Sequence, residues 1–234
     1  MTLIAGMNLG SYAIIAADTR LSYYINDVFS YRDDSEKIRN IDPGIISGAG
    51  LASLLEAVKA RLDDDELGII DRIADLVRGE VAYARQQPSA KDPRVAEAIE
   101  MTAWMFTYVG APDPNDPSTA VLRLALTVPS ENHWLASVAV NDVWLLPPTG
   151  TTEDQFWTWK RRLKNNLQPR TKGEDFPDSL QHHLQLIEEL MQDVSAVNQG
   201  VAPTFQVGIH IFPRTRLISN VIRPGEGITW NQYK

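Results

Sequence analysis

The chain opens on two short apolar runs that meet at a turn. Residues 2–8 and 11–18 are rich in Ile and Ala, and Asn8-Leu9-Gly10-Ser11 at their junction has the composition of a hairpin turn. The second run ends in the polar trio Asp18-Thr19-Arg20. Because the strands of a hairpin run antiparallel, this trio is expected to return to the side of Thr2. The first twenty residues therefore predict two buried strands with a charged cluster beside the start of the chain.

Thr2 has the chemistry of a nucleophile. It follows Met1 directly, and Thr is small enough for Met1 to be removed by ordinary N-terminal processing. Removal leaves a free α-amine beside the Thr2 hydroxyl, and a Thr whose base is its own amine is a recognised nucleophile. The pKa of an α-amine is ordinarily about 7.7–8.0, so this group accepts a proton at neutral pH without a histidine. We therefore expect Thr2 to be catalytic once Met1 has been removed.

The rest of the chain alternates between strand-like and helix-like segments. Apolar residues at helical spacing predict helices over residues 51–62, 67–87 and 178–194, and a short helical stretch that ends near Glu100. Strands are predicted at residues 35–41, 44–48, 102–109, 119–128, 134–140, 205–211 and 216–222. This order predicts a single α+β domain over residues 1–234, with helices covering antiparallel sheets.

Composition argues against several classes of function. The formal net charge of −8 argues against a nucleic-acid partner, which needs a basic surface. Cysteine is absent, so the chain has no disulfide, no thiol nucleophile and no cysteine-ligated zinc. The four histidines lack metal-ligand spacing with a carboxylate, and no phosphate-binding loop or dinucleotide fingerprint occurs. We expect no metal and no cofactor.

The sequence shows no sign of export or membrane insertion. No basic-then-apolar leader opens it, and no apolar run approaches the roughly 18 residues that span a bilayer. These observations predict a soluble, cytoplasmic protein without a membrane partner.

Three further features lie in the N-terminal part of the chain. Lys37 stands in a strand-like segment, where a surface lysine on an edge strand is common. Asp18 and Arg20 are ordinarily explained as an ion pair that closes a turn. Ser47-Gly48-Ala49-Gly50 is ordinarily explained as a tight connection from a strand to a helix. Each explanation is adequate alone, but together with Thr2 the features form a pattern.

The pattern resembles the proteasome β-subunit, including its bacterial forms, and the related peptidase of the bacterial ATP-dependent double ring. Thr2 matches the terminal nucleophile, and Asp18 follows sixteen residues later in Ala16-Ala17-Asp18-Thr19-Arg20, which is the family spacing. Lys37 matches the strand lysine, and Ser47-Gly48-Ala49-Gly50 matches the oxyanion turn. The match is specific over about residues 2–55. It implies a four-layer α/β/β/α sandwich of the N-terminal-nucleophile hydrolase type.

The resemblance also implies a role for each residue. The Thr2 hydroxyl attacks a carbonyl carbon and passes its proton to the α-amine, and a cationic Lys37 keeps that amine unprotonated. Asp18 holds Lys37 charged and in place, while Arg20 braces Asp18 and its loop. The backbone N–H of Gly48, expected at a helix start, stabilises the oxyanion.

The second half of the chain departs from the family pattern. Active β-subunits carry a Gly-Ser segment before a late helix, and then an Asp followed closely by Ser-Gly. In this chain Ser130, Asp193 and Ser195 are the candidates for these places, but their glycine neighbours are missing.

An aromatic cluster lies in an otherwise polar stretch. It consists of Phe156, Trp157 and Trp159. Such clusters are enriched at subunit interfaces, and a small satellite core explains this one equally well. Both explanations stay open at the level of sequence.

Three functions fit these observations. The favoured one is a threonine-type endopeptidase subunit that cleaves peptides or unfolded proteins and assembles into a ring of about six or seven subunits, stacked as a double ring. The alternatives are an N-terminal-nucleophile amidase that acts on small amides without a ring, and a non-catalytic ring-forming homologue. The intact set of Thr2, Asp18 and Lys37 argues against the last. The sequence identifies no ATPase unfoldase partner.

Overall fold

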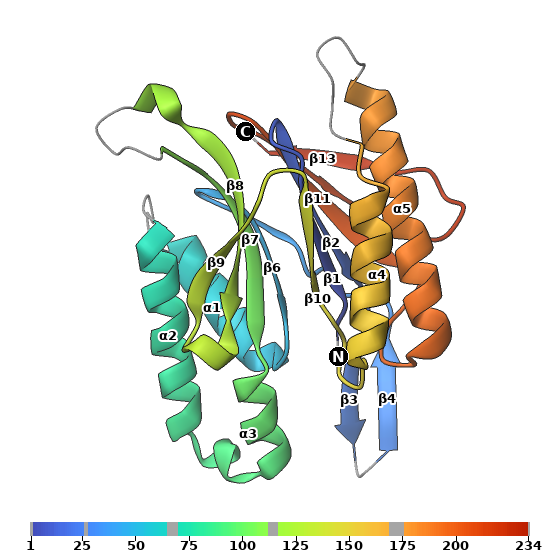
Figure 1. Ribbon diagram of the computed structural model, residues 1–234. Helices are drawn as coiled ribbons and strands as arrows, with labels where there is room; N and C mark the ends of the chain where they lie inside the picture. The colour runs from blue at the N-terminus through green and yellow to red at the C-terminus, as the bar shows by residue number, and fades with distance from the viewer. Residues whose placement is uncertain (1, 26–27, 65–69, 112–116, 169–175, 234) are drawn as a thin grey trace.

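The computed structural model describes residues 2–25, 28–64, 70–111, 117–168 and 176–233. A six-stranded antiparallel sheet is built around the predicted N-terminal hairpin, in the order β10-β1-β2-β11-β12-β13 (Figure 1). Ile4 pairs with Ala17, so Leu3 and Asp18 meet at the open end of the hairpin, where the Asp18 N–H donates to the Leu3 carbonyl. The strands are β1 (Ile4–Asn8), β2 (Tyr12–Asp18), β10 (Asp142–Leu146), β11 (Phe205–Ile211), β12 (Thr215–Ser219) and β13 (Trp230–Tyr233).

A second sheet has five antiparallel strands in the order β5-β6-β7-β8-β9. They are β5 (Arg39–Ile41), β6 (Gly44–Ala49), β7 (Ala103–Gly110), β8 (Val121–Val128) and β9 (Trp134–Val138). Between β2 and β5 the chain forms a separate two-stranded hairpin of β3 (Leu21–Ile25) and β4 (Val28–Arg32).

The helices fall into two groups along the chain. The first group consists of α1 (Ala52–Asp64), α2 (Ile70–Gln86) and α3 (Pro93–Glu100). The second group consists of α4 (Glu153–Asn165) and α5 (Phe176–Val197). Short 3-10 helices span η1 (Pro88–Lys91), η2 (Pro117–Thr119) and η3 (Pro129–Glu131). Together with the sheets, these helices confirm the predicted α+β class.

Two apolar clusters hold the five-stranded sheet in place. One lies between the two sheets and includes Ile15, Ile45 and Met105. The other packs α1 and α2 against the opposite face of the five-stranded sheet, through residues such as Leu55 and Trp104. Alternate residues of β6 and β7 contribute to the two clusters because successive side chains of a strand point to opposite faces.

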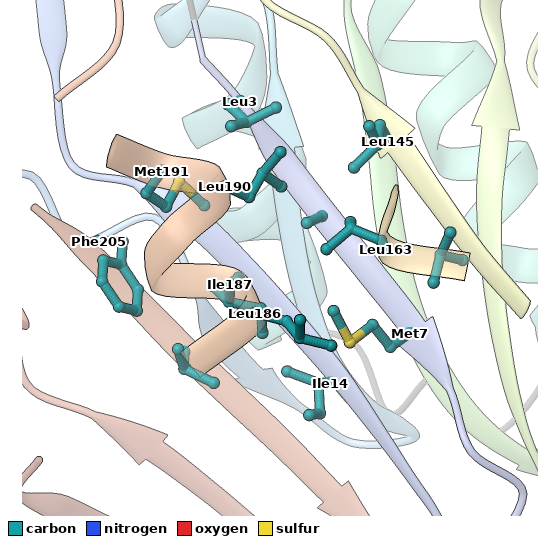
Figure 2. Close-up of a cluster of buried hydrophobic side chains, with 14 of the residues drawn as sticks. Leu3, Met7, Ile14, Leu145, Leu163, Leu186, Ile187, Leu190, Met191 and Phe205 are labelled. Carbon is teal, nitrogen blue, oxygen red and sulfur yellow. The ribbon is translucent and has the colours of Figure 1, made fainter. Parts of the chain in front are cut away.

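A third cluster joins α4 and α5 to the six-stranded sheet. Figure 2 shows Ile187 and Leu190 of α5 and Leu163 of α4 around Met7 and Ile14 of the N-terminal hairpin. Viewed as a whole, the helices of the first group, the two sheets and the helices of the second group follow one another across the molecule (Figure 1).

Glycine allows the two sheets to approach closely. A Cβ atom on Gly6 of β1 would lie 2.3 Å from the Met105 sulfur, and one on Gly208 of β11 would lie 2.7 Å from Ile45 Cδ1. Contacts this short do not occur between real side chains, so a larger residue at either position would force the facing side chain to move. The inner faces of β1 and β11 can therefore press against β6 and β7.

Two local predictions are wrong at positions that matter for the site. Residues 35–38 are not in a strand, because β5 covers only Arg39–Ile41. Gly48 does not lie at a helix start but inside β6, paired with Trp104, and α1 begins only at Ala52. The helix dipole therefore does not act at Gly48, and any role of its N–H has to come from its place in the sheet.

Candidate active site

Asp18 is the anchor of the predicted cluster. It is the last residue of β2 and is fully buried. Its carboxylate accepts hydrogen bonds from the backbone N–H groups of Leu3 at 2.8 Å, Arg20 at 2.9 Å and Ala202 at 3.4 Å. Three donors on three different segments fix the position of this carboxylate.

Lys37 reaches from its irregular segment into the same cluster. Its Nζ donates to Thr2 Oγ1 at 2.9 Å and to the Arg20 carbonyl at 2.6 Å, and it lies 3.4 Å from Asp18 Oδ1. Thr2 and Lys37 are both buried, at 8% and 7% exposure. The structure thus brings together Thr2, Asp18 and Lys37, the three residues that the sequence singled out as the reacting group and its support.

Burial sets the direction of both pKa shifts in this pair. It raises the pKa of the Asp18 carboxyl above its ordinary value of 3.8, against the opposing effects of Lys37 and the backbone donors. It lowers the pKa of the Lys37 ammonium below its ordinary value of 10.5, against the opposing charge of Asp18. Lys37 therefore loses its proton at a lower pH than a surface lysine does.

Arg20 contacts the cluster through its backbone and braces a loop with its side chain. Its guanidinium forms two 2.7 Å hydrogen bonds to the carboxylate of Asp33 and lies 3.8 Å from the centre of the Tyr31 ring. Another of its nitrogens donates to the carbonyl of Gln199, at the end of α5. Arg20 therefore ties the β3–β4 hairpin and the loop after α5 to the end of β2, away from the Thr2 hydroxyl.

The orientation of the Gly48 N–H follows from its place in the sheet. The N–H of Trp104, its pair partner on β7, points to Thr127 Oγ1 on β8 at 3.0 Å. Trp104 and Gly48 therefore form a non-hydrogen-bonded pair, in which both N–H groups point outward. The N–H of Ile45, an odd-numbered residue of β6, points toward β7 and donates to Thr107, as this alternation requires. The N–H of Gly48 thus points to the side of β6 where β5 and Lys37 lie.

The three candidates in the second half of the chain lie elsewhere. Asp193 of α5 pairs with Arg162 of α4, and Ser195 Oγ donates to the carbonyl of Gln192 within its own helix. Ser130 is exposed in η3. The loop after α5 does contribute to the site, because the N–H of Ala202 donates a hydrogen bond to Asp18. A backbone group of this kind leaves no mark in the sequence.

Sequence reasoning missed Gln206, which contacts the backbone on either side of the Lys37 side chain. Gln206 Oε1 accepts from the N–H groups of Lys37 at 3.0 Å and Ile38 at 2.9 Å. It is one of two polar residues, with His210, in the mostly apolar segment Phe205–Ile211, and that is the only local signal that could have drawn attention to it.

Two other kinds of functional feature, a metal site and a membrane-spanning helix, concern the described residues as a whole. Within the described ranges, no group of three or more His, Asp or Glu residues is placed to hold a metal ion. Among the helices that the structure describes, none combines the length and the apolar character that a membrane crossing requires.

Comparison with known proteins gives a match in structure but not in sequence. No protein-family model matches the chain, and no curated protein matches it. A mutant of Anbu, an ancestral β-subunit, from Hyphomicrobium sp. strain MC1 has a TM-score of 0.61 and 14% identity, over 99% of this chain and 87% of that one. Anbu from Pseudomonas aeruginosa, solved as a helical assembly, has a TM-score of 0.63 and 14% identity, over 99% and 86%.

HslV from Trypanosoma brucei is a more distant match. It has a TM-score of 0.50 and 9% identity, over 88% of this chain and 98% of that one. The chain shares its fold with Anbu and HslV. At these identities the likeness concerns the fold, so any assignment of chemistry has to come from the residues of this chain.

Proposed function

We propose that this chain is a threonine-type peptidase subunit of the N-terminal-nucleophile class, with Thr2 as its nucleophile. One observation carries the proposal: the Lys37 ammonium lies 2.9 Å from Thr2 Oγ1 and rests on a buried Asp18. Burying a lysine and an aspartate is costly, and this pair lies at the hydroxyl of the second residue of the chain. Perturbed, buried pairs of this kind cluster at functional sites.

The chemistry begins with removal of Met1, which frees the Thr2 amine. That amine takes the proton of the hydroxyl as Oγ1 bonds to the carbonyl carbon of a peptide. The positive charge of Lys37 favours the unprotonated amine beforehand and steadies the developing negative charge on Oγ1. The protonated amine then gives its proton to the leaving nitrogen, and water cleaves the ester on Thr2.

Gly48 is proposed to stabilise the oxyanion in this reaction. Its N–H points from β6 toward the Lys37 side of the sheet, as its pairing with Trp104 requires. A preorganised backbone donor of this kind contributes through its fixed direction rather than through a helix dipole. Arg20 is proposed to act at a distance, by bracing the end of β2.

The fold supports the same class of enzyme. The order of helices, sheet, sheet and helices is what a four-layer sandwich of the N-terminal-nucleophile type requires, and we propose that residues 1–234 form one such domain. We further propose that the subunits assemble with one another and act on peptides or unfolded proteins. An amidase that acts on small amides remains the second candidate.

Removal of the Thr2 hydroxyl tests the assignment of the nucleophile. Ala, Ser and Thr are all small enough at position 2 for Met1 to be removed. Thr2→Ala deletes the hydroxyl together with the γ-methyl group, whereas Thr2→Ser deletes only the methyl group, so the pair isolates the effect of the hydroxyl. With a Thr-directed epoxyketone, intact mass should show a labelled wild-type chain without Met1, a labelled Thr2→Ser variant and an unlabelled Thr2→Ala variant. Labelling of Thr2→Ala, or an active wild type that retains Met1 quantitatively, would exclude Thr2 as the nucleophile.

A further inference from the structure

Gln206 occupies a position where an apolar residue would be expected. It lies opposite Ala17 in the pairing of β11 with β2, and both residues face the apolar layer between the two sheets. Its neighbours Phe205 and Val207 face the other way, into the α5 side of the sheet. Gln206 is 3% exposed, so its amide has to find partners inside the protein.

The hydrogen-bond partners of the Gln206 amide fix its orientation. Oε1 receives the N–H groups of Lys37 and Ile38, and Nε2 donates to the Ser219 carbonyl at 3.2 Å. Exchanging the oxygen and nitrogen would set donors against donors, so these partners determine the orientation. The side chain therefore connects the segment that carries Lys37 to β11 and β12.

The β5 ladder does not extend back to Lys37, because β5 begins at Arg39. Arg39 pairs with Ile46, and the same register two residues further would pair Lys37 with Gly48. Because the Gly48 N–H points to that side, Lys37 and Gly48 would then exchange hydrogen bonds as a ladder pair. Instead, the N–H of Lys37 goes to Gln206. The segment is therefore separated from β6 at Lys37, whose side chain reaches Thr2.

We propose that Gln206 is a positioning residue: it holds the backbone of Lys37 away from β6, so that Nζ reaches Thr2 and the Gly48 N–H stays outside the β5 ladder. The purpose assigned to this geometry rests on the proposed function. The hydrogen bonds from the Lys37 and Ile38 N–H groups to Gln206, which we call the clamp, are a property of the fold alone. The clamp explains why a buried glutamine interrupts an apolar strand. It also explains why residues 35–38 do not continue β5.

Two substitutions separate the hydrogen bonds of Gln206 from its volume. Gln206→Leu has a similar size and accepts nothing. Gln206→Glu keeps an oxygen in front of both N–H groups and, protonated as expected of a buried acid, donates from its other oxygen to the Ser219 carbonyl. Asn8→Leu is the matched control, because Asn8 is another buried amide of the same sheet, and it donates to the Val138 carbonyl away from the site. A loss of stability caused by deleting any buried amide should appear in both Leu variants.

The first readout is amide hydrogen exchange at Ile38, which needs no activity. Gln206→Leu should expose the Ile38 amide to exchange, because that N–H points away from β6 even if the ladder continues to Lys37. Gln206→Glu and Asn8→Leu should keep it protected. The second readout is epoxyketone labelling of Thr2 against pH. Gln206→Leu should label about 100-fold more slowly, the loss expected from a misplacement of about 1 Å. The alkaline limb of its labelling profile should also move to higher pH. Burial lowers the pKa of Lys37, so a loosened Lys37 that contacts water keeps its positive charge to higher pH.

The outcomes distinguish the two proposals. Unchanged protection of Ile38 in Gln206→Leu would overturn the clamp. Lost protection with an unchanged labelling rate and pH profile would overturn its positioning role. A wild-type chain without Met1 that is never labelled would overturn the proposed function, whatever the exchange data show. If Gln206→Leu does not fold, slow exchange together with retained labelling in Gln206→Glu supports the proposal, and fast exchange in that variant overturns it.

Discussion

At the scale of single residues, Asp18 and Lys37 behave as one unit. Each is the other's buried counter-charge, and each also touches backbone groups that the other does not. Removal of one leaves an uncompensated charge in the interior, which costs about 3–5 kcal/mol when a buried pair is broken. Function and local stability therefore depend on the same contacts.

We expect Lys37→Ala and Asp18→Asn each to lower the rate of Thr2 acylation by about 100-fold or more, the usual size of an acid–base contribution. Because the two residues act through one another, the double variant should be little slower than either single one. Single-turnover labelling measures the rate, and circular dichroism checks that each variant is folded. Losses that multiply in the double variant would show that the residues serve separate steps.

At the scale of elements, a hydrogen bond between His210 and Thr107 joins the two sheets inside the apolar layer. His210 Nδ1 of β11 lies 2.8 Å from Thr107 Oγ1 of β7. Thr107 Oγ1 already accepts the N–H of Ile45, so its hydroxyl proton is available for a neutral imidazole. Burial lowers the pKa of His210 to about 4, and the nearby charge of Arg216 adds to the effect.

The folded protein should therefore lose stability as the pH falls from about 6.5 to about 4. In this window His210 of the unfolded chain binds a proton and His210 of the folded chain does not. The shift corresponds to at most about 3 kcal/mol, and stability is recovered as the pH rises through the window. Urea unfolding between pH 4 and 7 should show a flatter profile for His210→Gln than for the wild type.

His182→Gln provides the control for that measurement. His182 lies on α5 and contacts the carbonyl of Asn166, outside the layer between the sheets. The variant shows what the loss of a histidine outside that layer does to the same measurement. Equal slopes for His210→Gln and the wild type would show that His210 is not the group that titrates.

At the scale of the whole molecule, the structure revises one argument for assembly. Of the aromatic cluster on α4, Trp159 is buried and Phe156 packs against the core, while Trp157 is 41% exposed. Lys160 covers the neighbouring Trp144, with its Nζ 3.7 Å from the ring centre. The cluster is therefore mostly a part of the core, and it does not support the assembly proposal.

Light scattering at micromolar concentration should show a particle of several 26.1 kDa chains. A closed ring of about six or seven subunits, single or stacked, has a mass that does not change with concentration, whereas an open helical assembly grows as concentration rises. Anbu of Pseudomonas aeruginosa was solved in a helical assembly, so the measurement is designed to distinguish a closed ring from an open helix. A stable monomer or dimer would contradict the assembly proposal and favour the small-amide amidase.

The sequence by itself determined the parts of this protein that depend on short-range patterns. An apolar run, a turn and a second apolar run can only return Asp18 to the side of Thr2, and the pairing of Ile4 with Ala17 shows this. Helical spacing located α1, α2 and α5 because each has one apolar face. The segment of α4 carries a similar signal, with a capping box formed by Thr152 and Gln155, but its charged residues concealed the signal.

Only the tertiary structure decided how the site is held. Gln206 meets Lys37 across 169 residues of sequence, and a glutamine inside a strand looks the same whether it faces water or a backbone amide. The Gly-rich residues around Gly48 locally favour a turn. Gly48 nevertheless lies within β6, because pairing with Trp104 of β7 outweighs that preference. Contacts between distant segments depend on sheet order and register, and neither leaves a periodic pattern in the chain.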